Sequence, residues 1–544
     1  MTNLMELGER TFDLIIIGGG IVGAGIARDA ALRGLRVALF EKNDFGGGTT
    51  AGSTRLIHGG LRYLEMLDFR LVRLDLRERE TLLRIAPHLV KPLEFLVPFY
   101  NRSFLYRWKM RAGMILYDLL SFDKSLPRHR FLSADEIKAS EPQLQDEGLQ
   151  GAAAYYDAQA SSPERLCLEN LLEAHEHCAV LCNYAEVTGA VRSGNAITGV
   201  RVKDALNPGG GEVEVKGRVV VNASGPWFDR VAGKLAATKS HQIRTTKGIH
   251  FTSPPLNQRA LVLFSKIDGR LFFAIPWLGY SWIGTTDTDF SDDPGKARAT
   301  AADVDYTFES VREFLPSIDY DQIFFSNAGV RALVMEEGSE SSVSRMHRIA
   351  NGAQEGIPGL ISVLGGKLTG YRAIAEEATD VVCQVLGTRH PCRTAELPLP
   401  GARQTGSPIV AAPGLSQETV DHLHRLYGAR AAKVLRLAST DEKLGAKLSP
   451  SYPDIAAQVI FAIREEQCVR LSDFIWRRTL LGFSHDQGRS AVPNIMDLMA
   501  GEMNWSAARR TAELANYQRL IDHTQEFRRQ DVPMGAKKKN MMTA

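Results

Sequence analysis

The chain has 544 residues, too many for one ordinary domain, and its 44% hydrophobic and 24% charged residues predict a globular protein with a large buried core. A formal net charge of only +2 gives no overall field for nucleic-acid binding, so we expect no nucleic-acid partner. We expect no membrane-spanning helix, because no run of 18 apolar residues occurs, and no secretory signal. The six scattered cysteines fit a reducing cytoplasm better than a disulfide framework.

The first predicted unit is a strand, a glycine-rich turn and a helix. Phe12–Ile17 is a short apolar run typical of a buried parallel strand. Gly18, Gly20 and Gly23 follow in the spacing that allows a tight turn, close approach of a pyrophosphate and close packing of the next helix. Glu41 closes the second strand, where its carboxylate can accept hydrogen bonds from a ribose. The unit predicts a dinucleotide site; it leaves FAD and NAD open, although its place at the extreme N-terminus favours FAD.

A second glycine-rich segment, 45–64, carries hydroxyl side chains and His58 without a strand pattern. It reads either as a surface loop or as a set of backbone donors for a bound ring. Leu64, Leu67, Leu71 and Leu74 recur at spacings of three and four, which predicts a helix directly after it.

Further elements follow in order. A helix over 163–177 and a strand over 179–187 are expected, and the His and Cys residues between them are interpreted as the polar end of the helix, not as metal ligands. Alternating residues in 270–275 and 280–284 predict an antiparallel sheet. Pro, Gly and Ser residues from 397 to 414 predict a linker. Apolar residues at helical spacing then predict helices at 455–463, 473–483, 492–500 and 507–521.

The segment Leu56–Leu64, which reads LIHGGLRYL, closely resembles the respiratory, FAD-dependent glycerol-3-phosphate dehydrogenase family. Other segments resemble the family in the same order: 219–227, 246–250, 275–277, 284–287, 326–331 and 365–369. The resemblance implies an α/β fold: a glutathione-reductase-type, Rossmann-like FAD domain, an interleaved β-rich substrate (cap) domain and an all-α C-terminal domain. The chain departs from the family pattern at Thr49–Thr50, Arg55, Ala332 and Gly370.

The resemblance and the predicted elements divide the chain. An oxidoreductase region over 10–400 is expected to contain FAD segments at about 10–85, 160–240 and 345–400 and cap segments at about 86–159 and 241–344. A linker over 401–414, a helical domain over 415–525 and a disordered basic tail over 526–544 complete the chain.

The cofactor implied is FAD. The residues expected to hold it are Gly18, Gly20, Gly23, Glu41, Thr50, Ser53, Leu56, His58, Gly59, Val187, Ser224, Gly225, Gly366, Lys367, Leu368 and Thr369. Lys367 precedes a predicted helix over 371–386, and a cation or helix N-terminus there favours negative charge on the flavin.

The reaction implied is oxidation of sn-glycerol 3-phosphate to dihydroxyacetone phosphate. It needs a base, for which the resemblance favours His250, with His58 as the rival, and a cation for the phosphate, for which Arg331 is favoured. Arg345, Arg62 and Tyr63 are further substrate-site candidates.

The electron acceptor implied is a membrane quinone, so the protein is expected on the cytoplasmic face of the inner membrane as a peripheral protein. Residues 102–120 mix basic, aromatic and aliphatic side chains and read equally as an interfacial helix or as a packed cap helix. An α-glycerophosphate oxidase that uses oxygen, a dehydrogenase of another polyol phosphate or an amino acid, and a non-catalytic binding protein on the same scaffold are the alternatives. A homodimer is allowed, although the sequence does not determine the oligomeric state.

Overall fold

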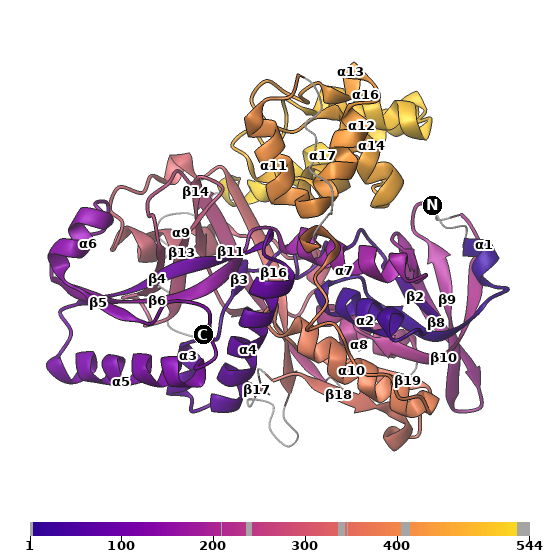
Figure 1. Cartoon of the computed structure of the whole chain (residues 1–544), viewed down its shortest axis with the longest axis horizontal. Coiled ribbons are helices and arrows are strands. Elements are labelled where there is room, and N and C mark those ends of the chain that lie inside the picture. The colour runs from indigo at the N-terminus through magenta and orange to yellow at the C-terminus, as the bar shows by residue number, and fades with distance from the viewer. Residues whose placement is uncertain are drawn as a thin grey trace.

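Figure 1 shows the computed structural model of the chain, which describes residues 4–207, 209–235, 242–335, 343–344, 346–403 and 414–529. Two sheets lie side by side, and the helices that follow residue 414 form a separate group above them (Figure 1). The predicted fold class is confirmed: an α/β dinucleotide-binding layer, a β-rich layer interleaved with it along the chain, and a helical C-terminal part.

The dinucleotide sheet is mostly parallel. Its strands are, in spatial order, β18 (Arg348–Asn351), β19 (Leu360–Leu364), β10 (Glu212–Asn222), β1 (Thr11–Ile17), β2 (Val37–Phe40) and β7 (Val180–Cys182). In addition, β9 (Ala196–Asp204) pairs with β10, and β8 (Ala185–Ser193) pairs with β9. Leu14 and Ile16 pack into a core with α2 (Ile21–Leu32), α7 (Pro163–Glu176) and α10 (Tyr371–Leu386). Ile15 and Ile17 pack instead with β8 and β9, so both faces of β1 are buried and its second half, residues 14–17, is entirely apolar.

The second sheet is mostly antiparallel. Its strands are, in spatial order, β17 (Val343–Ser344), β16 (Phe325–Met335), β11 (Ile243–Ser253), β14 (Tyr280–Gly284), β13 (Leu271–Trp277), β12 (Ala260–Phe264), β4 (Val90–Tyr100), β6 (Leu149–Ala160) and β3 (Leu56–Ile57), with β5 (Arg130–Leu132) on β6 and β15 (Thr288–Asp289) on β11. β3 falls in a segment expected to belong to the FAD domain, yet it pairs with β6, so the second glycine-rich segment crosses from one sheet to the other.

The remaining helices flank the two sheets or form the C-terminal part. Around the sheets lie α1 (Leu4–Leu7), α3 (Arg62–Glu65), α4 (Phe69–Ile85), α5 (Phe104–Leu120), α6 (Ala134–Ser140), α8 (Phe228–Lys234) and α9 (Ala301–Arg312). The C-terminal part contains α11 (Gln417–Tyr427), α12 (Ala431–Ala438), α13 (Glu442–Gly445), α14 (Ala456–Glu465), α15 (Leu471–Asp473), the π-helical turn η7 (Phe474–Arg478), α16 (Val492–Met503) and α17 (Ala507–Thr524).

Two predicted elements were wrong because local backbone geometry interrupts them. The helix expected from Leu64 onward is broken after α3, since Leu67 adopts a left-handed φ of 57° and Asp68 then caps α4 through the Leu71 N–H. The strand expected over 179–187 is split into β7 and β8 by Tyr184, which also has a positive φ.

The C-terminal boundaries also differ from expectation. The helix predicted over 473–483 is a short α-turn followed by η7 and a 3₁₀ turn (Leu481–Phe483). The predicted disordered tail begins too early, because residues 526–528 form a 3₁₀ turn whose Phe527 is buried against Tyr320. At the predicted linker, residues 400–402 form a packed 3₁₀ turn; 404–413 and 530–544 lie outside the described residues.

Candidate active site

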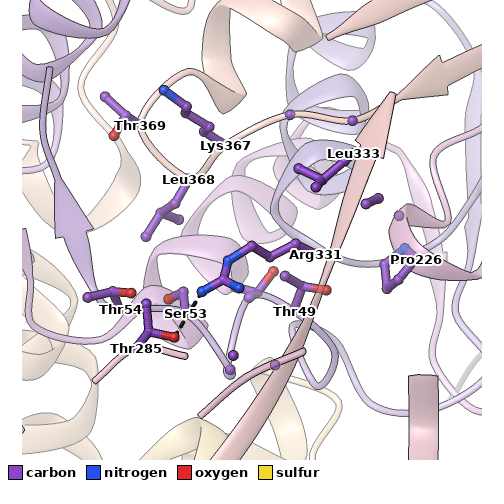
Figure 2. Close-up of a pocket in the computed structure, with 18 of the residues that line it drawn as sticks. Thr49, Ser53, Thr54, Pro226, Thr285, Arg331, Leu333, Lys367, Leu368 and Thr369 are labelled. Atoms are coloured by element: carbon purple, nitrogen blue, oxygen red, sulfur yellow. Dashed lines mark hydrogen bonds between the residues drawn. The ribbon is translucent and has the colours of Figure 1, made fainter. Parts of the chain in front are cut away.

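A cavity of about 1300 Å³ runs between the two sheets. Its wall on one side is the turn after β1 together with the loop over 41–56, and on the other side it is formed by β11, β13 and β16. Figure 2 shows part of this cavity, with Arg331 of the second sheet pointing toward Ser53 and Thr54 of the loop. Its volume exceeds the roughly 300–1,000 Å³ of an ordinary ligand pocket, so it can hold a small second ligand beside a dinucleotide.

The dinucleotide end fits a pyrophosphate. Gly18 has a φ of 110°, and a Cβ on Gly23 would lie 1.9 Å from the Gly18 carbonyl oxygen, so both glycines are required by the turn. Gly20 precedes α2 and has no side chain with which to cap it, and the first turn of the helix contains no acidic residue. The Ile21 N–H donates to the Thr50 hydroxyl at 3.1 Å, and the dipole at this helix N-terminus, which opens into the cavity, favours phosphate groups.

Glu41 directly follows β2 and lines the cavity, in the position where the sequence predicts a ribose contact. Its carboxylate accepts hydrogen bonds from the backbone N–H groups of Gly19, at 2.8 Å, and Asn43, at 2.9 Å. The carboxyl ends of the parallel strands β1, β2, β10 and β19 meet at this edge of the sheet, where α/β folds of this kind bind their ligands.

The opposite wall of the dinucleotide end is built by the His58 loop and the turn after β19. The Thr369 hydroxyl accepts a hydrogen bond from the His58 N–H at 3.1 Å, which ties the two together. Lys367 extends its ammonium over the Tyr63 ring, 3.7 Å from its centroid, and pairs with Asp75 at 2.8 Å. Burial, with Lys367 nearby, lowers the pKa of His58 to about 3, which makes this imidazole neutral.

Most of the residues expected from the sequence lie on this cavity wall: Gly18, Gly20, Glu41, Thr50, Ser53, Leu56, His58, Tyr63, Val187, Ser224, Gly225, His250, Arg331, Gly366, Lys367, Leu368 and Thr369. Gly23 and Gly59 do not line it; the Gly59 N–H donates to the Tyr117 hydroxyl behind the wall, and Gly60 lines the cavity instead. The side chain of Arg62 and the whole of Arg345 lie outside the described residues.

His250 and Arg331 lie on two neighbouring strands. Thr246 of β11 pairs with Arg331 of β16, and His250 lies four residues further along β11, on the same face because side chains alternate along a strand. The Arg331 side chain runs back over Gly248, where a Cβ would lie 2.3 Å from its Nη2 atom. The guanidinium therefore lies beside the position two residues from His250, about 7 Å along the strand.

The His250 imidazole is buried and neutral. Its ring stacks on Trp282 with centroids 5.0 Å apart, and its Nε2 lies 3.0 Å from the Thr54 hydroxyl. Gly284 faces it in the register, and a Cβ there would lie 2.4 Å from the imidazole. Burial lowers the pKa of His250 to about 3, with further contributions from Arg331 and Arg55. A neutral imidazole on a cavity wall can accept a proton.

Arg331 is held by the turn after β14. Its Nη2 donates to the Thr285 hydroxyl at 2.8 Å (Figure 2), and its Nη1 lies 3.0 Å from Asp287 and 3.1 Å from the Thr286 carbonyl. These contacts fix the direction of the fork, which suits an anion with several oxygen atoms.

Sequence reasoning missed several residues of the site. Thr285 and Asp287 belong to a segment recognised by resemblance, but no role was assigned to them, although a hydroxyl and a carboxylate beside a predicted arginine were the available signal. Thr54 was missed because its contact with His250 joins residues 196 positions apart. Arg55 is fully buried between Trp277 and Phe483 and pairs with both oxygens of Glu164, a contact that no local pattern indicates.

The chain is similar to known flavoenzymes along almost its whole length. Residues 13–372 match the FAD dependent oxidoreductase family, and residues 392–510 match the C-terminal domain of alpha-glycerophosphate oxidase. A glycerol-3-phosphate dehydrogenase of Synechocystis sp. is 39% identical over 96% of this chain and 98% of its own. The chain belongs to the FAD-dependent glycerol-3-phosphate dehydrogenase family. The aerobic glycerol-3-phosphate dehydrogenase of Bacillus subtilis, another relative in this family, is 33% identical over 95% of this chain and 96% of its own.

A solved structure in the family carries the cofactor. The glycerol-3-phosphate dehydrogenase of Bacillus halodurans, crystallised with FAD, matches with a TM-score of 0.77 at 29% identity, over 96% of each chain. The prediction of FAD is thus confirmed, and the residues at the dinucleotide end of the cavity fit it.

Proposed function

We propose that the protein oxidises sn-glycerol 3-phosphate to dihydroxyacetone phosphate and passes the electrons to a membrane quinone. The observation that carries this proposal is that a neutral imidazole, His250, and a fixed guanidinium, Arg331, lie on neighbouring strands of one sheet and line the same cavity as the dinucleotide loop. A base and an anion-binding group about 7 Å apart match a short alcohol that carries a phosphate.

Arg331 binds the phosphate in this proposal. A phosphate monoester carries nearly two negative charges at neutral pH, and the guanidinium fork can donate two parallel hydrogen bonds to it. Thr285 lies beside the same guanidinium and adds a hydroxyl to this end of the cavity. Tyr63 lines the cavity, whereas Arg62 and Arg345 stay predictions from the sequence.

His250 takes the proton of the C2 hydroxyl. Bound FAD would supply the acceptor for the hydride that leaves C2 and the route for the electron pair to the external acceptor. As the C2–H bond breaks, the hydroxyl proton moves to Nε2 of His250 and the C2–O bond becomes the ketone. Without substrate, Nε2 lies 3.0 Å from the Thr54 hydroxyl, so a bound alcohol would replace or share that contact. Lys367 lines the cavity at the turn before α10 and would hold positive charge beside the flavin.

The membrane contact is proposed for α5. Its outer face exposes a group of large apolar side chains, Phe104, Leu105, Trp108, Ile115 and Leu119, followed by Phe122. Arg111 is exposed among them, as on helices that lie on anionic membrane surfaces, whereas the exposed Lys109 lines the cavity. Met110, Gly113 and Leu116 of the same helix line the cavity, so α5 separates the cavity from this apolar face. No helix in the described parts of the chain is long and apolar enough to span a bilayer.

Binding to vesicles tests this surface. The protein should sediment with vesicles that contain anionic lipid, and Trp108→Ser with Leu119→Ser should lose this binding while dye-linked turnover of the soluble enzyme is kept. Equal sedimentation of the double variant and the parent protein would exclude α5 as the contact.

The second candidate function is a glycerophosphate oxidase. It is favoured by the match of residues 392–510 to the C-terminal domain of alpha-glycerophosphate oxidase. Anaerobic turnover with a short-chain quinone supports the dehydrogenase, and stoichiometric hydrogen peroxide in air supports the oxidase. The phosphate requirement is tested separately: with an artificial dye as acceptor, glycerol 3-phosphate should be oxidised and glycerol should not.

A further inference from the structure

A buried cluster of charges joins the C-terminal helices to the loop that follows Glu41. Asp44 is 2% exposed, and both of its carboxylate oxygens are bound by Arg478, at 2.7 and 2.9 Å. Arg477 donates from Nε to the same carboxylate at 2.5 Å, and the Asn183 amide donates to it at 2.9 Å. Two arginines more than 430 residues away in the chain thus converge on one aspartate of the dinucleotide domain.

The loop that carries Asp44 is part of the cofactor site. It begins at Glu41, whose carboxylate also holds the Gly19 N–H of the pyrophosphate turn. Two residues after Asp44, the Gly46 N–H donates to the Gly19 carbonyl oxygen at 2.9 Å. Residues 42, 43, 47 and 48 line the cavity on either side of Asp44. Movement of Asp44 would therefore shift both Glu41, the expected ribose contact, and the pyrophosphate turn.

The two arginines are presented by the π-helical turn η7. The Thr479 N–H donates to the Phe474 carbonyl oxygen at 2.9 Å, five residues back, as in a π-helix. Such turns are rare and occur frequently at functional sites. Arg478 also donates to the Glu466 carbonyl oxygen, and Arg477 pairs with Asp473 at 2.6 Å. Each guanidinium is therefore also held by a residue of the C-terminal part.

The charges in this cluster are strongly coupled. Burial by itself would favour the protonated carboxyl, but Arg478 and Arg477 hold the pKa of Asp44 well below its usual range. Weakening one arginine would leave a buried carboxylate insufficiently compensated, which is costly, and the loop would have to move toward water.

We propose that the Arg477–Arg478 pair of the C-terminal domain positions the FAD-binding loop through Asp44. No described residue of that domain lines the cavity, so its contribution to the cofactor site is indirect. Coupling of this kind is reciprocal: bound FAD must stabilise the docked position of η7 as much as η7 stabilises bound FAD.

The test compares Arg478→Lys with a matched control, Arg165→Lys, in the full-length protein. Arg165 makes an equally buried two-point pair with Glu466 of the C-terminal part, at 2.5 and 2.7 Å, but it has no described hydrogen bond to residues 42–48. FAD is added back to each apoprotein and its dissociation constant is measured from the flavin fluorescence. Arg478→Lys should bind FAD about tenfold more weakly, whereas the control should stay within twofold of the parent even though thermal stability falls in both.

Equal FAD affinity in the two variants, whether weaker than in the parent or the same, would overturn the proposal. If Arg478→Lys does not fold, Arg477→Lys replaces it, because Arg477 is partly exposed, and a threefold loss of affinity is expected. Hydrogen exchange gives the reciprocal result: amides of 471–483 should exchange faster in apoprotein than in holoprotein, while those of α17 should not change. Identical exchange of 471–483 in the two forms would contradict the coupling.

Discussion

Removal of the Arg331 guanidinium should weaken substrate binding in a way that depends on Asp287. One charge-assisted hydrogen bond contributes about 1.5–3 kcal/mol, so two bonds to the phosphate at the lower figure contribute about 3 kcal/mol. Arg331→Ala should therefore raise the dissociation constant of glycerol 3-phosphate about 150-fold. Asp287, which lies 3.0 Å from the guanidinium, would then face the phosphate without the positive charge of Arg331 between them.

The Asp287 side chain is 35% exposed, so we take the repulsion between it and the phosphate to be screened by water. In water, one negative charge about 6 Å from a phosphate dianion is disfavoured by about 1.4 kcal/mol, or roughly tenfold in affinity. Asp287→Asn should therefore recover about tenfold of the affinity lost in Arg331→Ala.

Rapid mixing without oxygen gives the dissociation constant from the concentration dependence of flavin reduction. The cycle consists of the parent, both single variants and the double variant. An unchanged dissociation constant in Arg331→Ala would refute the phosphate role. Equal constants for Arg331→Ala and the double variant would refute the repulsion by Asp287.

Three further predictions concern the groups around the flavin. His250→Gln should slow flavin reduction at least 100-fold, within the usual contribution of a general base, while FAD stays bound; a parental rate would assign the base elsewhere, with His58 the next candidate. Because the pKa of His250 is lowered to about 3, the imidazole is neutral far below pH 6.5. The second-order rate constant of flavin reduction, corrected for the second ionisation of the substrate phosphate near pH 6, should then be constant from pH 8 to pH 5. A further decrease of this rate constant between pH 7 and pH 6 would contradict a neutral His250. Asp75→Asn leaves Lys367 without its carboxylate partner and should strengthen sulfite binding to the flavin about tenfold; unchanged sulfite affinity would show that this charge does not reach the flavin.

The dinucleotide unit could be predicted from the sequence because its signals are local. The apolar run of β1, the glycines and Glu41 each follow from the period and the spacing of the residues around them. Recognition of FAD needed segments far from this unit, such as 56–64 and 365–369, and a resemblance that linked them.

The parts that could not be predicted depend on contacts between distant segments. The strand expected over 179–187 is interrupted at Tyr184, whose hydroxyl donates to Asp473, 289 residues away. Likewise, Arg477 and Arg478 look like solvated charges on a predicted helix until the fold brings Asp44 beside them. Charged residues are rarely buried without partners, and those partners are visible only in three dimensions.

An anaerobic spectral titration tests the central claim most directly. The purified holoprotein is titrated with sn-glycerol 3-phosphate while the visible absorbance of the flavin is recorded, and the product is quantified. We expect loss of the oxidised flavin spectrum at one equivalent, with one dihydroxyacetone phosphate formed per FAD. A flavin spectrum that persists in excess glycerol 3-phosphate, but is lost with an amino acid or another polyol phosphate, would contradict it.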